Sequence, residues 1–155
     1  MDQKLKEKLE DLFTKISFTI TEQGFSVPLF IMHLSDGEMM PVMMSGHSEI
    51  SIEEYASAAM LGASEMNAMA LIFICEQYVV SKRKDDVEMQ CLLNGTIKPS
   101  DHPDREECLT MIYMDKKGKC ISLIGKIEKD IRGTKYINET HWTQGSVTNI
   151  IQPWG

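Results

Sequence analysis

The most unusual stretch of this sequence is the polar run over residues 98–107, which reads KPSDHPDREE. Its two prolines stiffen it, because proline fixes the backbone angle φ. Carboxylates and an imidazole at this density could hold a hard cation or act as general acid and base. The side chains with that chemistry are Asp101, His102, Asp104 and Glu106. The simpler interpretation is a loop with surface salt bridges, because Asp and Ser before proline are ordinary turn formers.

A second candidate is Glu76, a carboxylate that directly follows the apolar residues 71–75. A carboxylate at that position must be desolvated, paired, or placed at a strand end open to water. Arg105 is the expected partner, because its planar guanidinium suits a buried carboxylate. Such a pair would hold the loop against the sheet. In the alternative, a raised pKa would make Glu76 a catalytic candidate.

Other residues that often carry chemistry have no recognisable spacing here. The histidines lack HxH, HxxxH and HExxH patterns, and no GxSxG, Walker or GxGxxG sequence occurs. Cys75, Cys91, Cys108 and Cys120 contain no CxxC pair. All but Cys91 lie in apolar runs, so we expect reduced thiols that pack as small hydrophobic residues. We therefore predict no cofactor.

Twelve methionines are many for 155 residues, and positions 39, 40, 43 and 44 cluster beside Met32. Thioethers can bind Cu(I), but copper carriage of that type favours an exported protein. Methionine is also frequent on adaptable binding surfaces and in ordinary cores. The cluster therefore predicts either core packing or a hairpin that binds a partner or a second copy of the chain.

Composition sets the class of protein that positions these residues. With 43% hydrophobic and 25% charged residues, the chain matches globular proteins rather than disordered or disulfide-stapled ones. Its length fits one domain over residues 1–155. The net charge of −7 repels a phosphate backbone, so no nucleic-acid partner is expected. A charged start and a longest apolar run of only residues 68–75 predict a cytoplasmic protein with no membrane partner.

Two helices are predicted from the hydrophobic spacing. Apolar residues recur at helical spacing over 2–16. This helix either continues to Gln23 or gives way to a strand, since residues 16, 18 and 20 also alternate, and Gly24 is the expected stop. Ser51 begins a capping box for a second helix over 52–66. Many small residues in this second helix predict that it packs closely against a sheet or another helix.

Alternating and continuous apolar runs predict the strands. The polar, glycine-containing turns at 36–37 and 115–118 indicate two hairpins. Pro28 and Pro41 cannot donate to a ladder, which favours sheet edges or strand ends for them. The expected strands cover residues 25–34, 38–44, 70–81, 107–114 and 119–129, with a short edge strand over 135–138.

The element order predicts an α+β fold. We expect a single, mainly antiparallel sheet of about five strands in the order α-β-β-α-β-(long loop)-β-β, with the helices packed on the sheet. The long loop covers residues 83–106. Connections of that length inside a compact domain are uncommon and tend to be functional.

The sequence ALIFICEQYVVS over 70–81, together with PSDHPDREE over 99–107, resembles an uncharacterised group of small bacterial and phage proteins. That group carries an apolar strand ending in a Glu-x-aromatic step, followed by a PSxxPDRxE loop. The resemblance covers residues 50–125 and implies the same small α/β domain. It does not point to a particular activity, because the group has no known function. The chain has tyrosine where tryptophan is expected in the step. The motif positions are Glu76, Tyr78, Ser100, Pro103, Asp104, Arg105 and Glu107.

The leading functional expectation is a noncatalytic protein-binding or regulatory module that forms a homodimer through a sheet edge or the Met-rich hairpin. The element order is similar to that of roadblock and longin-like domains, and this fold-level analogy implies a dimerising scaffold. The alternative is a small metal-dependent hydrolase. Its site would combine Glu76 with the 99–107 loop, where Asp101, His102 and Asp104 would be bases or ligands.

Overall fold

The computed structural model describes residues 2–43, 51–79 and 106–144. These residues belong to two compact units. One unit contains the first helix and is built from residues 2–25, 76–79, 106–109 and 125–140. The other contains the second helix and is built from residues 26–43, 51–75, 110–124 and 141–144. That the whole chain is one domain stays a prediction.

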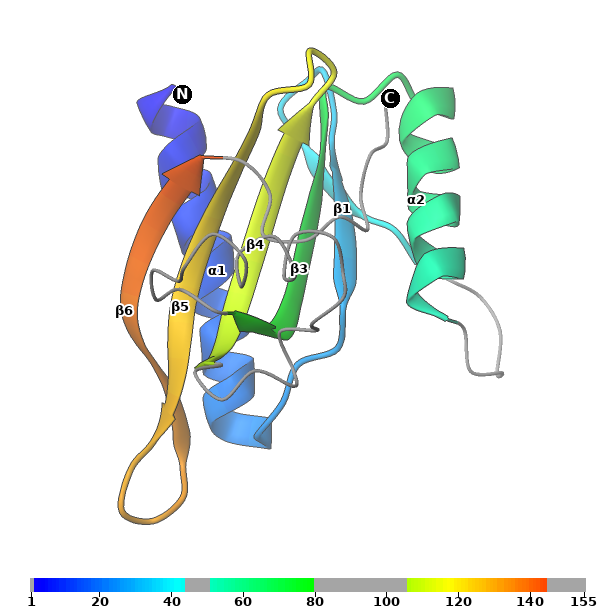
Figure 1. Cartoon of the computed structure of the whole chain (residues 1–155). Coiled ribbons are helices and arrows are strands. Elements are labelled where there is room, and N and C mark those ends of the chain that lie inside the picture. The colour runs from blue at the N-terminus through cyan, green and yellow to red at the C-terminus, as the bar shows by residue number, and fades with distance from the viewer. Residues whose placement is uncertain (1, 44–50, 80–105, 145–155) are drawn as a thin grey trace, which may run out of the picture. The chain divides into compact units, whose positions relative to one another are not determined.

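The described residues form two helices and six strands. Their order is α1 (Gln3–Gln23), β1 (Leu29–His33), β2 (Met39–Pro41), α2 (Ile52–Glu65), β3 (Ala70–Val79), β4 (Glu106–Asp115), β5 (Cys120–Lys129) and β6 (Lys135–Gln144). All six strands belong to one antiparallel sheet, in the order β2-β1-β3-β4-β5-β6 (Figure 1). The predicted α+β class is therefore confirmed. The expected number of strands was too low, because the predicted short edge strand is the full-length sheet strand β6.

Helix α1 begins and ends where capping chemistry places its termini. The side chain of Asp2 accepts a hydrogen bond from the backbone N–H of Lys4 at 3.2 Å, which satisfies one of the free donors of the first turn. At the other end Gly24 has a left-handed φ of 85°, and its N–H donates to the carbonyl of Ile20. Between the caps, Leu9, Phe13 and Ile20 are buried.

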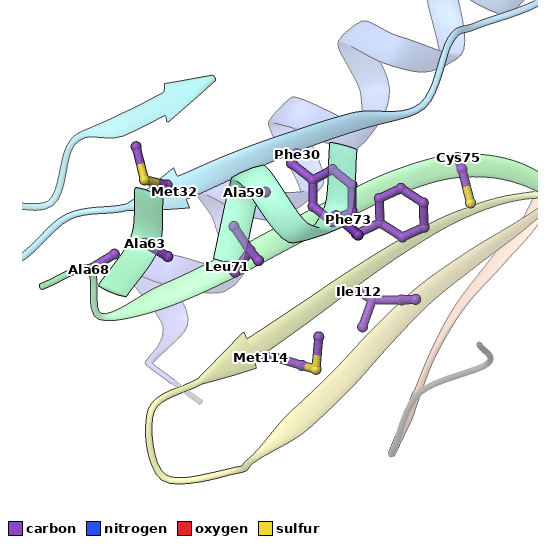
Figure 2. Packing of buried hydrophobic residues seen from close by; sticks show 11 residues of the cluster. Phe30, Met32, Ala59, Ala63, Ala68, Leu71, Phe73, Cys75, Ile112 and Met114 are labelled. Carbon is purple, nitrogen blue, oxygen red and sulfur yellow. The ribbon is translucent and has the colours of Figure 1, made fainter. Parts of the chain in front are cut away.

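Helix α2 packs closely on the sheet because its buried face carries alanine. Ser51 caps the helix, its Oγ accepting from the N–H of Glu54 at 3.1 Å. Ala56, Ala59 and Ala63 are fully or almost fully buried. They belong to one hydrophobic cluster with side chains of β1, β3 and β4 (Figure 2). The predicted close packing of this helix is confirmed.

Two stacked phenylalanines mark the centre of this cluster. Phe30 of β1 and Phe73 of β3 are directly paired in the antiparallel register, and their ring centroids are 4.4 Å apart with an 18° interplanar angle (Figure 2). Tyr55 of α2 meets Phe30 edge-on, with ring centroids 4.8 Å apart. Because β1 and β3 are each buried along most of their length, they act as interior strands of the sheet.

The first hairpin is shorter than its apolar pattern predicts. Strand β1 starts only after Pro28, and β2 ends at Pro41 after three residues. Proline lacks the N–H that a ladder requires, which explains why β1 starts only after Pro28. Strand β2 lies at one edge of the sheet, as the proline positions predicted.

Candidate functional site

Most of the predicted polar site lies outside the described residues. Ser100, Asp101, His102, Pro103, Asp104 and Arg105 all belong to this part of the chain. The proposed cation site and the proposed pair between Glu76 and Arg105 therefore stay predictions. Three residues of the predicted motif, Glu76, Tyr78 and Glu107, can be placed.

Glu76 and Tyr78 lie in the last part of β3, where burial decreases. Glu76 is half-buried and Tyr78 is exposed, whereas residues 70–75 of the same strand are all buried. Alternation along the strand puts both side chains on the face that carries Ile72 and Ile74. The Glu76 carboxylate is therefore not fully desolvated.

Glu107 connects two strands that are not neighbours. Lys135 Nζ lies 3.5 Å from Glu107 Oε1, and the two residues belong to β6 and β4, with β5 between them. Both side chains are partly exposed, so this ion pair contributes no more than about 1 kcal/mol to stability. The contact links β4 to the last strand of the sheet.

A polar cluster on β5 and β6 was not predicted from the sequence. Glu128 Oε2 accepts from the hydroxyl of Tyr136 at 3.1 Å and from Asn138 Nδ2 at 3.2 Å, and Lys126 Nζ lies 3.5 Å from Glu128 Oε1. The hydrogen bond from Tyr136 is the main cause that lowers the pKa of Glu128, and it raises the pKa of Tyr136. Glu128 is thus a carboxylate at neutral pH. It fastens the hairpin and is unsuited to act as a general acid.

A buried pair of polar side chains lies across the central strands. His33 Nδ1 of β1 is 3.0 Å from the hydroxyl of Tyr113 of β4, and strand β3 runs between them. His33 is paired in register with Ala70 of β3. Burial, followed by the charge of Asp115, raises the pKa of Tyr113 to about 12. The phenol stays protonated at neutral pH, so Tyr113 supplies a hydrogen bond rather than a phenolate.

The described cysteines behave as core residues. Cys75 and Cys108 are buried, Cys120 is half-buried, and none of the three forms a disulfide. Burial is the main cause that raises the pKa of Cys108 to about 11. Cys75 Sγ and Thr110 Oγ1 are 3.6 Å apart inside the sheet. The thiolate form of Cys108 is disfavoured, and so is reactivity of that thiol.

The Met-rich cluster is divided between core and surface. Met32 is buried under α2 and Met39 is half-buried. Met40 is 37% exposed and Met43 is 81% exposed, and residue 44 lies outside the described residues. Core packing therefore accounts for part of the cluster, and Met40 and Met43 lie at the surface.

Two features of the hairpin formed by β5 and β6 remain available for contacts. Strand β6 ends the strand order of the sheet, so its outer edge pairs with no other strand in the described part of the chain. The turn before it, residues 130–134, exposes Ile131 completely. The sequence predicted an edge strand only over residues 135–138, and it did not single out Ile131.

Comparisons with known proteins found no relative that points to a function. No protein family, no curated protein and no solved structure matches this chain. Within residues 2–43, 51–79 and 106–144, no three His, Cys, Asp or Glu side chains gather closely enough to hold a metal ion. No helix in the described ranges is long and apolar enough to cross a membrane.

Proposed function

We propose that this chain is a noncatalytic protein-binding module that forms a homodimer through the outer edge of β6. A single observation carries the proposal, which is the difference between the two edges of the sheet. One edge is β2, with three residues and a terminal proline. The other is β6, with ten residues and no proline. An edge strand of that length, with no further partner strand among the described residues, is a template for pairing with another chain.

The first half of β6 is the part suited to pairing. Glu139 has a left-handed φ of 52°, which interrupts the regular strand. Before it, the N–H of Asp130 donates to the carbonyl of Thr134 at 3.0 Å, which sets the register of the hairpin. Alternation along an antiparallel pair then directs the N–H groups of Tyr136 and Asn138 toward β5 and those of Lys135 and Ile137 outward.

These outward groups define one symmetric arrangement. Two copies of β6 can pair antiparallel about a twofold axis at Tyr136, so that Lys135 of one copy faces Ile137 of the other. No like charges face each other in that register. The two Tyr136 side chains would lie directly opposite, and an aromatic pair of this kind is favourable on a sheet face.

The proposal is tested by removing one outward donor. Lys135→Pro deletes the N–H of residue 135, and Lys135→Ala keeps this N–H while losing the same ion pair with Glu107. Sedimentation equilibrium should find a dimer for the wild type and for Lys135→Ala. For Lys135→Pro the dimer should dissociate at least about tenfold more readily. Equal dissociation constants for the two variants, both folded by circular dichroism, would overturn the edge contact.

A further inference from the structure

The turn between β5 and β6 has the same backbone hydrogen bonds as the turn between β4 and β5, which we call its twin. Comparing the twin turns draws attention to one exposed residue, Ile131. The turn 115–119 joins β4 to β5, and the turn 130–134 joins β5 to β6. In each, the first residue donates its N–H to the carbonyl of the fifth, and the glycine at the fourth position donates back to the first. The two glycines, Gly118 and Gly133, have φ values of 85° and 82°.

The aspartate that begins each turn holds it in the same way. Asp115 Oδ1 accepts from the N–H groups of Lys117 and Lys119 at 2.9 and 2.8 Å. Asp130 Oδ1 accepts from those of Arg132 and Thr134 at 2.8 and 3.0 Å. Each carboxylate is thereby engaged by its own backbone, and both turns are rigid and preorganised.

The twin turns differ at the second position, where one has Lys116 and the other Ile131. Ile131 is 104% exposed, more than any other large hydrophobic residue described. A β-branched aliphatic residue is a poor choice for a turn and contributes nothing to the core here. Lys116 contacts Met69 and Asn67 in its own turn, whereas Ile131 is fully exposed. Because the same turn backbone accepts lysine at that position, turn geometry does not explain isoleucine.

The surroundings of Ile131 are basic although the chain as a whole carries a net charge of −7. Lys129 and Arg132 are exposed and form no ion pair within the described part of the chain. The intervening Asp130 carboxylate is directed into the turn by its two hydrogen bonds. The tip, defined as residues 129–132, therefore presents one aliphatic side chain between two cations.

We propose that this tip docks into a partner protein at an apolar pocket rimmed by carboxylates. Arginine is enriched in interfaces, and a preorganised turn lowers the entropic cost of burying the isoleucine beside it. An anionic membrane has the same charge preference, but one aliphatic side chain and two cations give an affinity only on the order of millimolar. A protein pocket adds hydrogen bonds to Arg132 and shape complementarity, which favours it as the occupant.

This inference deepens the proposed function and rests on it, since it names the surface and the partner chemistry of a binding module. The tip and the β6 edge are separate contacts, so an experiment can disprove one proposal without disproving the other. Ile131→Lys copies the twin turn and should leave both the thermal midpoint and the dimer unchanged. If the wild type is monomeric but its tip still binds the partner, the proposed dimer contact is disproved and the proposed docking site is retained.

The test introduces a photo-activatable benzoyl-phenylalanine at position 131 of the full chain, with position 116 as the matched control. We expect an adduct with one protein at 131 that is absent at 116. That protein, once purified, should bind Ile131→Lys and Arg132→Glu at least about tenfold more weakly than the wild type.

Four results would overturn the docking proposal. They are no adduct at 131, the same adduct at 116, an adduct only with a second copy of this chain, and unchanged affinity for Ile131→Lys. Co-sedimentation with vesicles of phosphatidylserine and phosphatidylcholine tests whether the tip binds a membrane instead. Vesicle binding that is lost in Ile131→Lys, without any protein adduct, would assign the tip to a membrane surface instead.

Discussion

Phe13 of α1 lies so close to Gly125 of β5 that a Cβ atom at position 125 would be 3.0 Å from Phe13 Cζ. The same Cβ would be 2.4 Å from Cγ2 of Ile137 on β6. Glycine at this position lets the helix and two strands approach one another within one unit. Glycine is required here because there is no space for a side chain between α1 and the β5–β6 hairpin.

Gly125→Ala should therefore destabilise the protein by about 1–3 kcal/mol, because overpacking forces side chains away from their preferred rotamers. Urea denaturation measures the change. Gly62→Ala is the matched control, since its Cβ would meet Met32 Sδ at an ordinary 3.7 Å. In the interior of α2 that substitution should be neutral or stabilise by up to about 1 kcal/mol. Equal effects of the two substitutions would contradict the close approach.

Tyr55→Phe should cost about 1–3 kcal/mol, although it removes a single oxygen. The Tyr55 hydroxyl donates to the carbonyl of Val42 at 2.6 Å and accepts from the N–H of Phe30 at 3.1 Å. Its loss leaves a backbone donor without this acceptor beside the core. Tyr136→Phe, at an exposed hydroxyl, is the control and should change stability by less than about 1 kcal/mol. The comparison fails if both variants have the same urea midpoint.

Alkaline pH should weaken the fold in a defined window. Burial raises the pKa of Cys108 from 9.0 to about 11 and the pKa of Tyr113 from 10.0 to about 12. Both groups lose their protons more readily in the unfolded chain, so their contribution is complete below pH 9 and is lost between pH 9 and 12. Tyr113→Phe should flatten the upper part of this decline. Urea midpoints at unit pH steps measure it, and an unchanged slope above pH 10 in that variant would refute the assignment.

The symmetric register proposed for β6 predicts a covalent cross-link. Residues that face each other across a non-hydrogen-bonded antiparallel pair have Cα atoms about 4.5 Å apart, which suits a disulfide. Tyr136→Cys should form a dimer on non-reducing gels under mild oxidation. Thr140→Cys lies on the same exposed strand but off the axis and should not. Equal cross-linking of the two variants and the wild type would exclude this register.

Local structure was predictable where a single residue type determines it. Gly24 ends α1, Ser51 begins α2, and Asp36-Gly37 forms the first turn, with Gly37 at a φ of 90°. Strand ends were less predictable, because β1 starts only after Pro28 and β2 ends after three residues, so both are shorter than their apolar runs. The hydrophobic pattern indicates which residues are buried, whereas the length of a strand also depends on which backbone N–H groups can pair with a neighbouring strand.

Contacts between distant residues could not be predicted, because they depend on strand order. His33 and Tyr113 are 80 positions apart, and nothing in either local sequence indicates that β1 and β4 both flank β3. The pair of Glu107 with Lys135 is a further example, in which a motif residue contacts a strand beyond its neighbour. The candidate residues 100–105 lie outside the described residues, so their proposed chemistry is unchanged as a prediction.

The most direct test of the homodimer is a native mass spectrum of the untagged protein purified without chelator. A homodimer through β6 should appear as a species of twice 17.6 kDa with no further mass. A species at 17.6 kDa alone, across the concentration range of the experiment, would contradict dimerisation through β6. A stoichiometric ion or small ligand on that monomer would contradict the noncatalytic module as well.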